Sequence, residues 1–338
     1  MNVKHLALVA VAFAALAAPA FAQEPVTIRF GAAPVPVSPL NQRGVAPFIA
    51  KVQEDSQGTL KINVYPGATL GDPSHTYDNT LRGVYDMSFG MMGVVSSQFP
   101  KTHVTTLPFM NRNAHEASVA LWRLYANGTI ASEYANIHPL AIYDFVDTRI
   151  HSRKPIRTLE DMNGLKVTAT SRVVARAVSA VGGSLITMPP SEVYQVLQRG
   201  VADAAALAWT AVLPFKIAEV TNYHFDTSLG MEPAYLLMNK ETYARLPAPA
   251  RAAIDKDSGL VLSEHIGRLN DAIGEEDRAK VAKMPNQTIV EIDPKEASRW
   301  AQRMAPITDE WVKSTPDGAA VLAAYKAELV KIRAEQKK

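Results

Sequence analysis

The sequence predicts an α/β protein with two lobes, and three observations lead to this fold class. Strand-like and helix-like segments alternate through residues 26–92, and the same alternation recurs across residues 139–240. After Pro247 a helical pattern alone remains. A chain of 338 residues with 47% hydrophobic content can form one large or two medium-sized domains. The doubled alternation favours two lobes.

The first lobe begins with alternating apolar and polar residues, in which Val26, Ile28 and Phe30 share one face of a strand. Gly58 and Gly83 each follow a helix-like segment and mark its expected end. A strand–helix–strand order of this kind is typical of a largely parallel sheet. The predicted strands are residues 26–33, 60–67 and 85–92, and the predicted helices are residues 40–56 and 74–81.

The second lobe repeats this order from residue 139 onward. Thr158 and Asp161 have helix-capping spacing, and Gly200 is a candidate C-cap. Pro214 is expected to lie inside or to break the last helix of the series. The predicted strands are residues 139–152, 165–169, 185–188, 202–208 and 234–240, and the predicted helices are residues 173–181, 191–200 and 208–220.

The last part of the chain is helical. Leu262, Ile266, Leu269 and Ile273 recur at helical spacing, and the segment from Pro247 to about Lys283 reads as one unusually long helix. Residues 319–338 predict a charged amphipathic helix at the C-terminus.

The first 22 residues predict an export signal. Lys4 supplies the positive charge, an apolar run follows from residue 6 to 18, and a small-x-small tripeptide ends at Ala22, where cleavage is expected. The run is short and ends at Pro19, which argues against a membrane anchor. Loss of Lys4 with this segment lowers the net charge from +2 to +1. So small a net charge does not indicate a protein that binds nucleic acid.

Several kinds of chemistry are missing from the sequence. The chain has no cysteine, which excludes disulfides and thiolate nucleophiles. Its eight histidines include no pair at zinc-helix spacing, and no phosphate-binding or nucleophile-elbow motif occurs. We therefore expect neither a metal site nor a cofactor. A binding protein is the first hypothesis, an exported hydrolase with an unrecognised active site the second, and a structural envelope protein the third.

Seven segments, taken together and in this order, resemble segments of one protein family. They are KVQEDSQGTLKINVYPGATLGD (51–72), RGVYDMSFG (82–90), LPF (107–109), EDMNGLKV (160–167), MPPSEVYQVLQRGVADA (188–204), FKIAEVTNYH (215–224) and LLMNKETYARLP (236–247). Together they resemble the solute-binding proteins of TRAP transporters, of the DctP type.

The resemblance implies a two-lobed, periplasmic-binding-protein-like fold (type II-like), with a long helix spanning both lobes and helices at the C-terminus. It implies a periplasmic receptor, usually a monomer and not an enzyme, that closes around a small organic acid. The receptor would deliver the acid to the permease subunits in the membrane. The expected lobes are 24–147 plus 237–276 and 148–236 plus 277–308, with a helical tail at 309–338.

Two arginines are candidates for holding the carboxylate of the acid. Arg172 follows the strand 165–169 at the turn into a helix, where a planar guanidinium and free backbone N–H groups could bind an anion. Its alternative is a solvated surface charge. Members of the resembled family typically have arginine where this chain has Thr168, so Arg172 would replace that clamp. Arg149 matches a family position near the ligand, and its alternative is an ion pair with Asp147 or another acid.

The other candidates predict an apolar wall. Strand ends meet the crevice of such sheets, which favours Trp209 and Met91 as wall residues, whereas Phe89 fits the core better. Relatives that bind sugar acids carry polar residues at positions that correspond here to Pro73, Met91 and Leu207. The resemblance and the apolar wall therefore predict a monocarboxylate with a hydrophobic body, aromatic or aliphatic. The candidate wall residues are Trp209, Leu207, Met91, Phe89, Tyr77 and Pro34.

Overall fold

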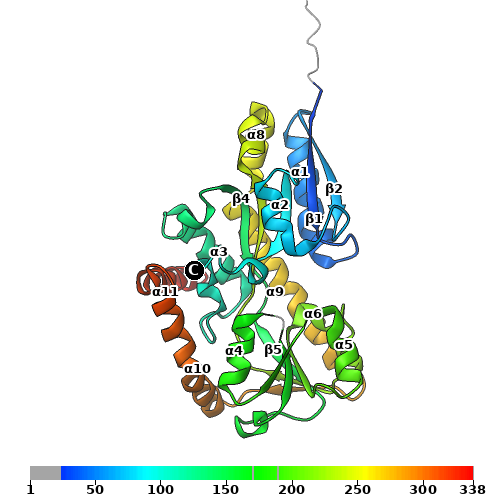
Figure 1. The fold of residues 1–338 in the computed structure, drawn as a ribbon, viewed down its shortest axis with the longest axis vertical. Coiled ribbons are helices and arrows are strands. Elements are labelled where there is room, and N and C mark those ends of the chain that lie inside the picture. Colours follow the sequence, from blue (N-terminus) through cyan, green and yellow to red (C-terminus); the bar gives the residue numbers. More distant parts are fainter. Residues whose placement is uncertain (1–23, 170, 189, 338) are drawn as a thin grey trace, which may run out of the picture.

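The computed structural model describes residues 24–169, 171–188 and 190–337. Two α/β lobes, one above the other, confirm the predicted fold class (Figure 1). The predicted export signal, residues 1–22, lies outside the described residues. No helix within the described ranges is long and apolar enough to cross a bilayer.

The upper lobe is built on a five-stranded sheet with the order β2 (Leu60–Pro66), β1 (Val26–Ala33), β3 (Met87–Met91), β10 (Pro233–Asn239) and β4 (Ile137–Asp144). β1 is parallel to both of its neighbours, whereas β10 is antiparallel to β3 and β4. Ile28 and Phe30 of β1 are buried in the core, as the alternating pattern predicts.

The lower lobe is built on a six-stranded sheet with the order β11 (Thr288–Glu291), β9 (Tyr223–Asp226), β5 (Thr148–Ser152), β8 (Ala204–Ala208), β6 (Lys166–Ala169) and β7 (Ser184–Thr187). β5 is antiparallel to β8 and β9, and the other pairs are parallel. The short strands β9 and β11 have no counterpart among the predicted elements.

Two short segments that link strands carry the chain from one sheet to the other. Residues 139–152, predicted as one strand, form the end of β4 in the upper sheet and all of β5 in the lower sheet, with residues 145–147 between them. Residues 227–232 carry the chain back from β9 to β10. Because β10 lies wholly in the upper sheet, the second lobe boundary falls before Pro233 and not after residue 236.

Helices cover both faces of each sheet. On the upper sheet, α1 (Ala46–Asp55), α8 (Ala248–Asp257) and α9 (Leu260–Ala282) share one core, and α2 (Thr76–Leu81), α3 (Ala114–Ala126) and α11 (Gly318–Glu335) share the other. On the lower sheet, α4 (Arg172–Ala180) and α10 (Pro294–Ser314) cover one face. The other face is covered by α5 (Pro190–Gln198), α6 (Trp209–Val212) and the end of α9. The short helix α7 (Lys240–Arg245) follows β10.

The single long helix predicted from Pro247 to about Lys283 is two helices, α8 and α9. Gly259 separates them with φ of 77°, a conformation that lacks a steric penalty only for glycine. Its N–H donates to the Leu140 carbonyl (2.7 Å), which is outside the helix. α9, with 23 residues, then runs from the upper to the lower lobe (Figure 1). Its Leu262 is buried in the upper core and its Val281 in the lower core.

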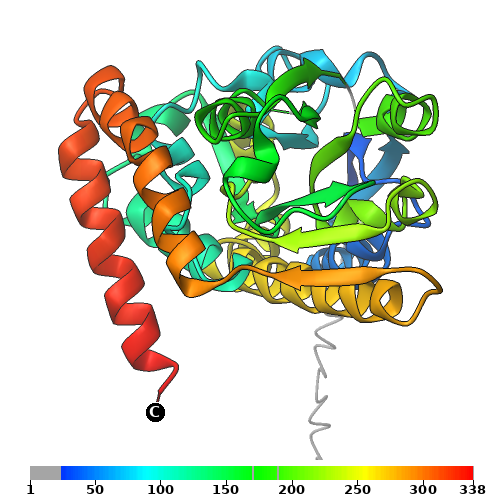
Figure 2. The same cartoon turned by 90° about the horizontal axis from the view of Figure 1, so that it is seen from below.

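The C-terminal helices α10 and α11 both lie at one edge of the molecule (Figure 2), with α11 level with the upper lobe and α10 extending down to the lower lobe in Figure 1. Trp300 of α10 is buried in the lower core, whereas Trp311 packs in the upper core and donates from Nε1 to the Pro100 carbonyl (3.2 Å). α11 then packs on α3 through Tyr325. α10 therefore contacts both lobes, and the expected boundary between residues 308 and 309 falls inside it.

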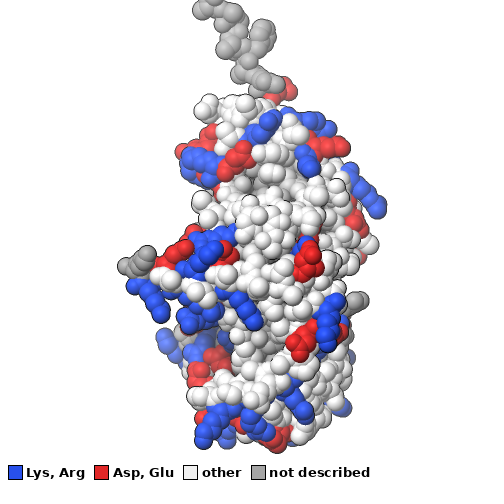
Figure 3. Space-filling model, turned by 90° about the vertical axis from the view of Figure 1, so that its left-hand side faces the viewer, with Lys and Arg blue, Asp and Glu red and all other residues white. Residues whose placement is uncertain are grey.

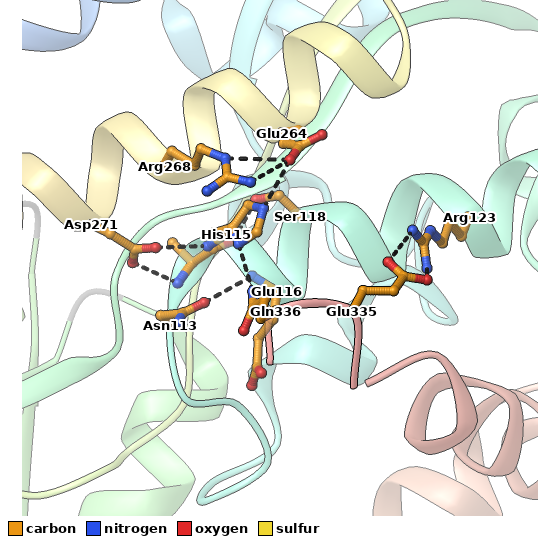
Figure 4. A network of polar contacts seen from close by, with 11 residues as sticks. Asn113, His115, Glu116, Ser118, Arg123, Glu264, Arg268, Asp271, Glu335 and Gln336 are labelled. Carbon is orange, nitrogen blue, oxygen red and sulfur yellow. Dashed lines mark hydrogen bonds and ion pairs between the residues drawn. The ribbon is translucent and has the colours of Figure 1, made fainter. Parts of the chain in front are cut away.

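A polar network fastens α9 and the C-terminus to the start of α3 (Figure 4). The Asp271 carboxylate on α9 accepts hydrogen bonds from the N–H groups of Ala114 and His115 (2.7 and 2.9 Å), which have no partner within their own helix. The His115 imidazole contacts Glu264 of α9 (3.1 Å) and Gln336 (2.9 Å). These contacts hold the upper part of α9 to the upper lobe.

The face formed by α10 and α11 carries basic and acidic side chains interspersed (Figure 3). Ion pairs connect some of them across elements, such as Lys101 with Asp317 (2.8 Å) and Arg123 with Glu335 (2.8 Å). Exposed pairs of this kind contribute about 0–1 kcal/mol each to stability. We therefore attribute the docking of α11 chiefly to its buried apolar side chains.

Candidate ligand-binding cleft

The carboxyl ends of parallel strands in the two sheets face each other. In the upper lobe, Gly93 follows the end of β3, and in the lower lobe Ser171 follows the end of β6. The Glu232 carboxylate connects them, because its Oε1 accepts a hydrogen bond from the Gly93 N–H (2.9 Å) and it also bonds the Ser171 hydroxyl. Crevices at such strand ends are where ligands bind in open α/β sheets.

Four of the predicted wall residues belong to the upper lobe. Met91, the last residue of β3, is half-buried and packs on the edge of the core, as does Phe89. Tyr77 is 5% exposed, and its ring lies edge-on to Phe99 with centroids 5.3 Å apart. Pro34 is also buried. The geometry therefore favours Met91 as a wall residue and places Tyr77 in the core.

Trp209 and Leu207, the predicted residues of the lower wall, lie at the end of β8. Trp209 is the first residue of α6, and both side chains are 4% exposed. The indole Nε1 of Trp209 has no hydrogen-bond partner within the described part of the chain. Behind the indole lie His151 and His224, whose ring centroids are 5.0 and 5.2 Å from it.

The two histidines behind Trp209 are a feature that the sequence did not predict. The register between β5 and β9 pairs His151 with His224, and their Nδ1 atoms are 2.8 Å apart. His151 Nε2 contacts the Leu207 carbonyl (3.1 Å), and His224 Nε2 contacts Gln287 (2.7 Å). Burial lowers the pKa of both imidazoles. The pair therefore supports the Trp209 wall without adding a fixed charge to it at neutral pH.

Thr168 and Arg172 lie on either side of the turn from β6 into α4. The Thr168 hydroxyl is fully buried on β6, and no described residue hydrogen-bonds to it. Arg172 is the first residue of α4, and Ser171 is the N-cap, accepting a hydrogen bond from the Val174 N–H (3.4 Å). The side chain of Arg172 lies outside the described part of the structure. Its role as a carboxylate clamp stays a prediction.

Arg149 lies in a cluster of carboxylates. Its Nε is 2.5 Å from Asp226 and its Nη1 is 3.2 Å from Asp147, and the guanidinium also donates to the Thr227 carbonyl. Burial acts to lower the pKa of Arg149, but the two carboxylates raise it overall. A pocket of about 380 Å³ between the crossing segments and α9 is lined by both Arg149 and Trp209. The ion-pair alternative for Arg149 thus has geometric support.

Glu232 is a second feature that sequence reasoning missed. It lies in the crossing segment, where its carbonyl accepts the Phe145 N–H (3.1 Å) and its carboxylate accepts the Gly93 N–H (2.9 Å). Burial raises the pKa of Glu232 to about 7, although the hydrogen bonds from Gly93 and Ser171 oppose this effect. An isolated acid between Met231 and Pro233 carries no sequence signal of this role, because its burial depends on the approach of both lobes.

Replacing Glu232 with glutamine should change how stability depends on pH. The pKa of this group is raised from 4.5 to about 7 on folding. The neutral acid therefore contributes stability that is present below pH 4.5 and is lost as pH rises through 7. The loss amounts to about 3 kcal/mol. We expect Glu232→Gln to gain about that much unfolding free energy, relative to the wild type, between pH 4.5 and pH 8.

Urea denaturation at the two pH values measures this effect, with the exposed Glu241→Gln variant as the matched control. Equal pH profiles for Glu232→Gln and Glu241→Gln would contradict the prediction.

Two α/β lobes, joined by crossing segments and a spanning helix around a cleft, define a solute-binding protein. The family model for bacterial extracellular solute-binding proteins, family 7, matches residues 32–315. The chain belongs to this family and is a DctP-type solute-binding protein of TRAP transporters. This is a family of receptors and not of enzymes.

Relatives of known name match most of the length of the chain. The outer membrane transporter protein TsaT of Comamonas testosteroni is 26% identical, with 97% of this chain and 98% of the relative covered. The C4-dicarboxylate-binding periplasmic protein DctP of Rhodobacter capsulatus is also 26% identical, with 93% of each chain covered.

Two solved structures resemble the fold closely. A TRAP solute-binding protein of Rhodoferax ferrireducens T118, in complex with copurified benzoate, is 30% identical with a TM-score of 0.84, covering 90% of this chain and 98% of its own. A marine metagenome TRAP solute-binding protein specific for aromatic acids, with 3-hydroxybenzoate, is 27% identical with a TM-score of 0.84, covering 91% and 98%.

Proposed function

We propose that this chain is a periplasmic receptor that binds a small aromatic monocarboxylic acid in the cleft between its lobes. The observation that supports the proposal is that the apolar residues Leu207 and Trp209 lie at the end of β8 and Met91 at the end of β3, the strand ends where we place the cleft. Aromatic stacking contributes about 0.5–1.5 kcal/mol beyond area burial. The benzoate and hydroxybenzoate bound by the two similar structures support the same ligand class.

Arg172 is the proposed anchor of the carboxylate. The charge of Arg149 is already shared between Asp147 and Asp226, so binding a ligand there would require breaking an existing ion pair. Arg172 begins α4 beside Ser171, whose hydroxyl reaches the cleft. The buried, unpaired hydroxyl of Thr168 could accept or donate one further hydrogen bond.

The receptor is proposed to act in the periplasm as a monomer, after cleavage of the leader behind Ala22. It would deliver the acid to the membrane permease subunits of a TRAP transporter. The family membership and the periplasmic relative from Rhodobacter capsulatus support this setting.

A thermal-shift screen tests the ligand class. A ligand at 100 times its Kd should stabilise the fold by about 2.7 kcal/mol through mass action. We expect benzoate and 3-hydroxybenzoate to raise the Tm and glucuronate to leave it unchanged, with an aliphatic monocarboxylate of similar size as the comparison. A shift with glucuronate alone would overturn the apolar cleft and the proposed function.

A further inference from the structure

Glu232 is an acid placed inside the cleft without a described basic partner. Its carboxylate is held between the upper lobe at Gly93 and the lower lobe at Ser171. No ion pair involves Glu232 among the side chains that the structure describes, and Asp144, an acid whose pKa the Glu232 charge helps to raise, is fully buried. Within the described side chains, Glu232 is therefore held by neutral hydrogen-bond donors rather than by a cation.

The surroundings of the carboxylate are shaped to receive it. A Cβ at Gly93 would lie 2.2 Å from Glu232 Oε1, so any other residue there would displace the carboxylate. Gly93 is not among the glycines with positive φ, so its backbone does not require glycine. The close approach of the carboxylate to the Gly93 N–H is the feature that requires it.

From this geometry we infer that Glu232 determines ligand specificity by restricting the cleft to acids with a single carboxylate. The inference rests on the proposed function and narrows its ligand class. A second carboxylate on the ligand would have to share a water-poor cleft with the Glu232 carboxylate, and like charges brought together in this way strongly disfavour binding. A ligand hydroxyl at the same place would instead donate a hydrogen bond to Glu232.

The electrostatic state of Glu232 fits this role. Its pKa is raised by burial to about 7, so the carboxylate is mostly ionised at pH 8. Among ligands of the same shape, the ionised Glu232 would then repel a second carboxylate and accept a hydrogen bond from a hydroxyl.

Three ring acids separate these effects at pH 8: benzoate, 3-hydroxybenzoate and benzene-1,3-dicarboxylate. The last two differ only in the group at the meta position. We expect calorimetry on the wild-type protein to give a dicarboxylate Kd at least about 100-fold above that of benzoate. Glu232→Gln should lower the ratio of the dicarboxylate Kd to the benzoate Kd by at least about tenfold. Glu232→Asp keeps the charge and should leave this ratio unchanged. Glu232→Ala is a second variant that removes the charge if the glutamine variant does not fold.

Each result decides the inference. If the wild type binds the dicarboxylate within tenfold of benzoate, or if removing the charge leaves the ratio unchanged, Glu232 does not set specificity and the proposed function stands. If none of the three acids binds the folded wild type, the proposed function fails and the inference fails with it. The exposed Glu241→Gln variant should give wild-type ratios throughout.

Discussion

Arg149→Ala should lower the unfolding free energy by about 3–5 kcal/mol, the usual result of removing one partner of a buried ion pair. The side chain of Arg149 is 22% exposed, and its partner Asp147 is 6% exposed. Without the guanidinium, the crossing segment between the lobes would hold an uncompensated carboxylate. Asp147 keeps hydrogen bonds from Ser228 (2.5 Å) and Gly230 (2.9 Å), and these favour the lower end of the range.

The chain offers a matched control for Arg149 in Arg176. Arg176 pairs with Glu310 at 3.3 Å, with side chains 52% and 59% exposed, and Arg176→Ala should lose no more than about 1 kcal/mol. Urea denaturation at pH 7.5 compares the two, provided that the m-value is unchanged. If Arg149→Ala lost less than about 1 kcal/mol of unfolding free energy, the prediction would be contradicted. The Arg149 guanidinium would then not be needed to neutralise the buried carboxylates and could bind a ligand instead. Coupling with Asp226→Asn in a double-mutant cycle would isolate the pair itself.

Periodicity predicted most of the strands and helices of this fold, although α3, β9 and β11 have no predicted counterpart, and it could not report which sheet a strand joins. Residues 139–152 are strand-like throughout, although the chain changes sheets at Phe145–Asp147. A period of two residues persists across such a crossing, so only the long-range partners of β4 and β5 reveal it. The break between α8 and α9 did have a local signal, Ser258-Gly259, which the regular spacing from Leu262 onward obscured.

The residues of the candidate site also fall into those that the local sequence could suggest and those that only tertiary contacts bring together. Trp209, Leu207 and Met91 could be proposed as wall residues because strand ends of α/β sheets point to the cleft. Their role stays a prediction. His151 and His224 are 73 positions apart, and the strand register brings their rings together. Glu232 gains its environment from Gly93 and Ser171, which come from different lobes. Positions of this kind depend on tertiary contacts and have no signature in a single sequence.

The position of Arg172 in α4 gives a reason to expect a binding role. It is the first residue of the helix, where the macrodipole disfavours a cation by about 0.3–1 kcal/mol. A cation placed there does not serve helix stability. We therefore expect Arg172→Ala to leave the unfolding free energy unchanged or slightly higher. A purely structural arginine would show the opposite effect.

Ligand affinity should respond very differently to the same substitution. Truncating one partner of a desolvated charge pair costs about 2–5 kcal/mol, mostly because the carboxylate is left unpaired. Arg172→Ala should therefore raise the Kd for benzoate by about 30-fold to several thousand-fold. Arg172→Lys should also bind more weakly, because a point charge does not reproduce the planar fork of a guanidinium. Thr168→Ala should lose only the 0.5–1.5 kcal/mol or so of one ordinary hydrogen bond.

Calorimetry with benzoate on folded variants separates the two arginines. Unchanged affinity in Arg172→Ala, together with lost affinity in a folded Arg149→Ala protein, would make Arg149 the anchor. Thr168 would then mark a position where this chain has lost the clamp that the family typically has. Lost affinity in Arg172→Ala with full stability would instead show that the clamp has moved four residues along the chain, from the end of β6 to the first turn of α4. The guanidinium would then work beside the Ser171 hydroxyl at the helix N-terminus, where free N–H groups also favour an anion.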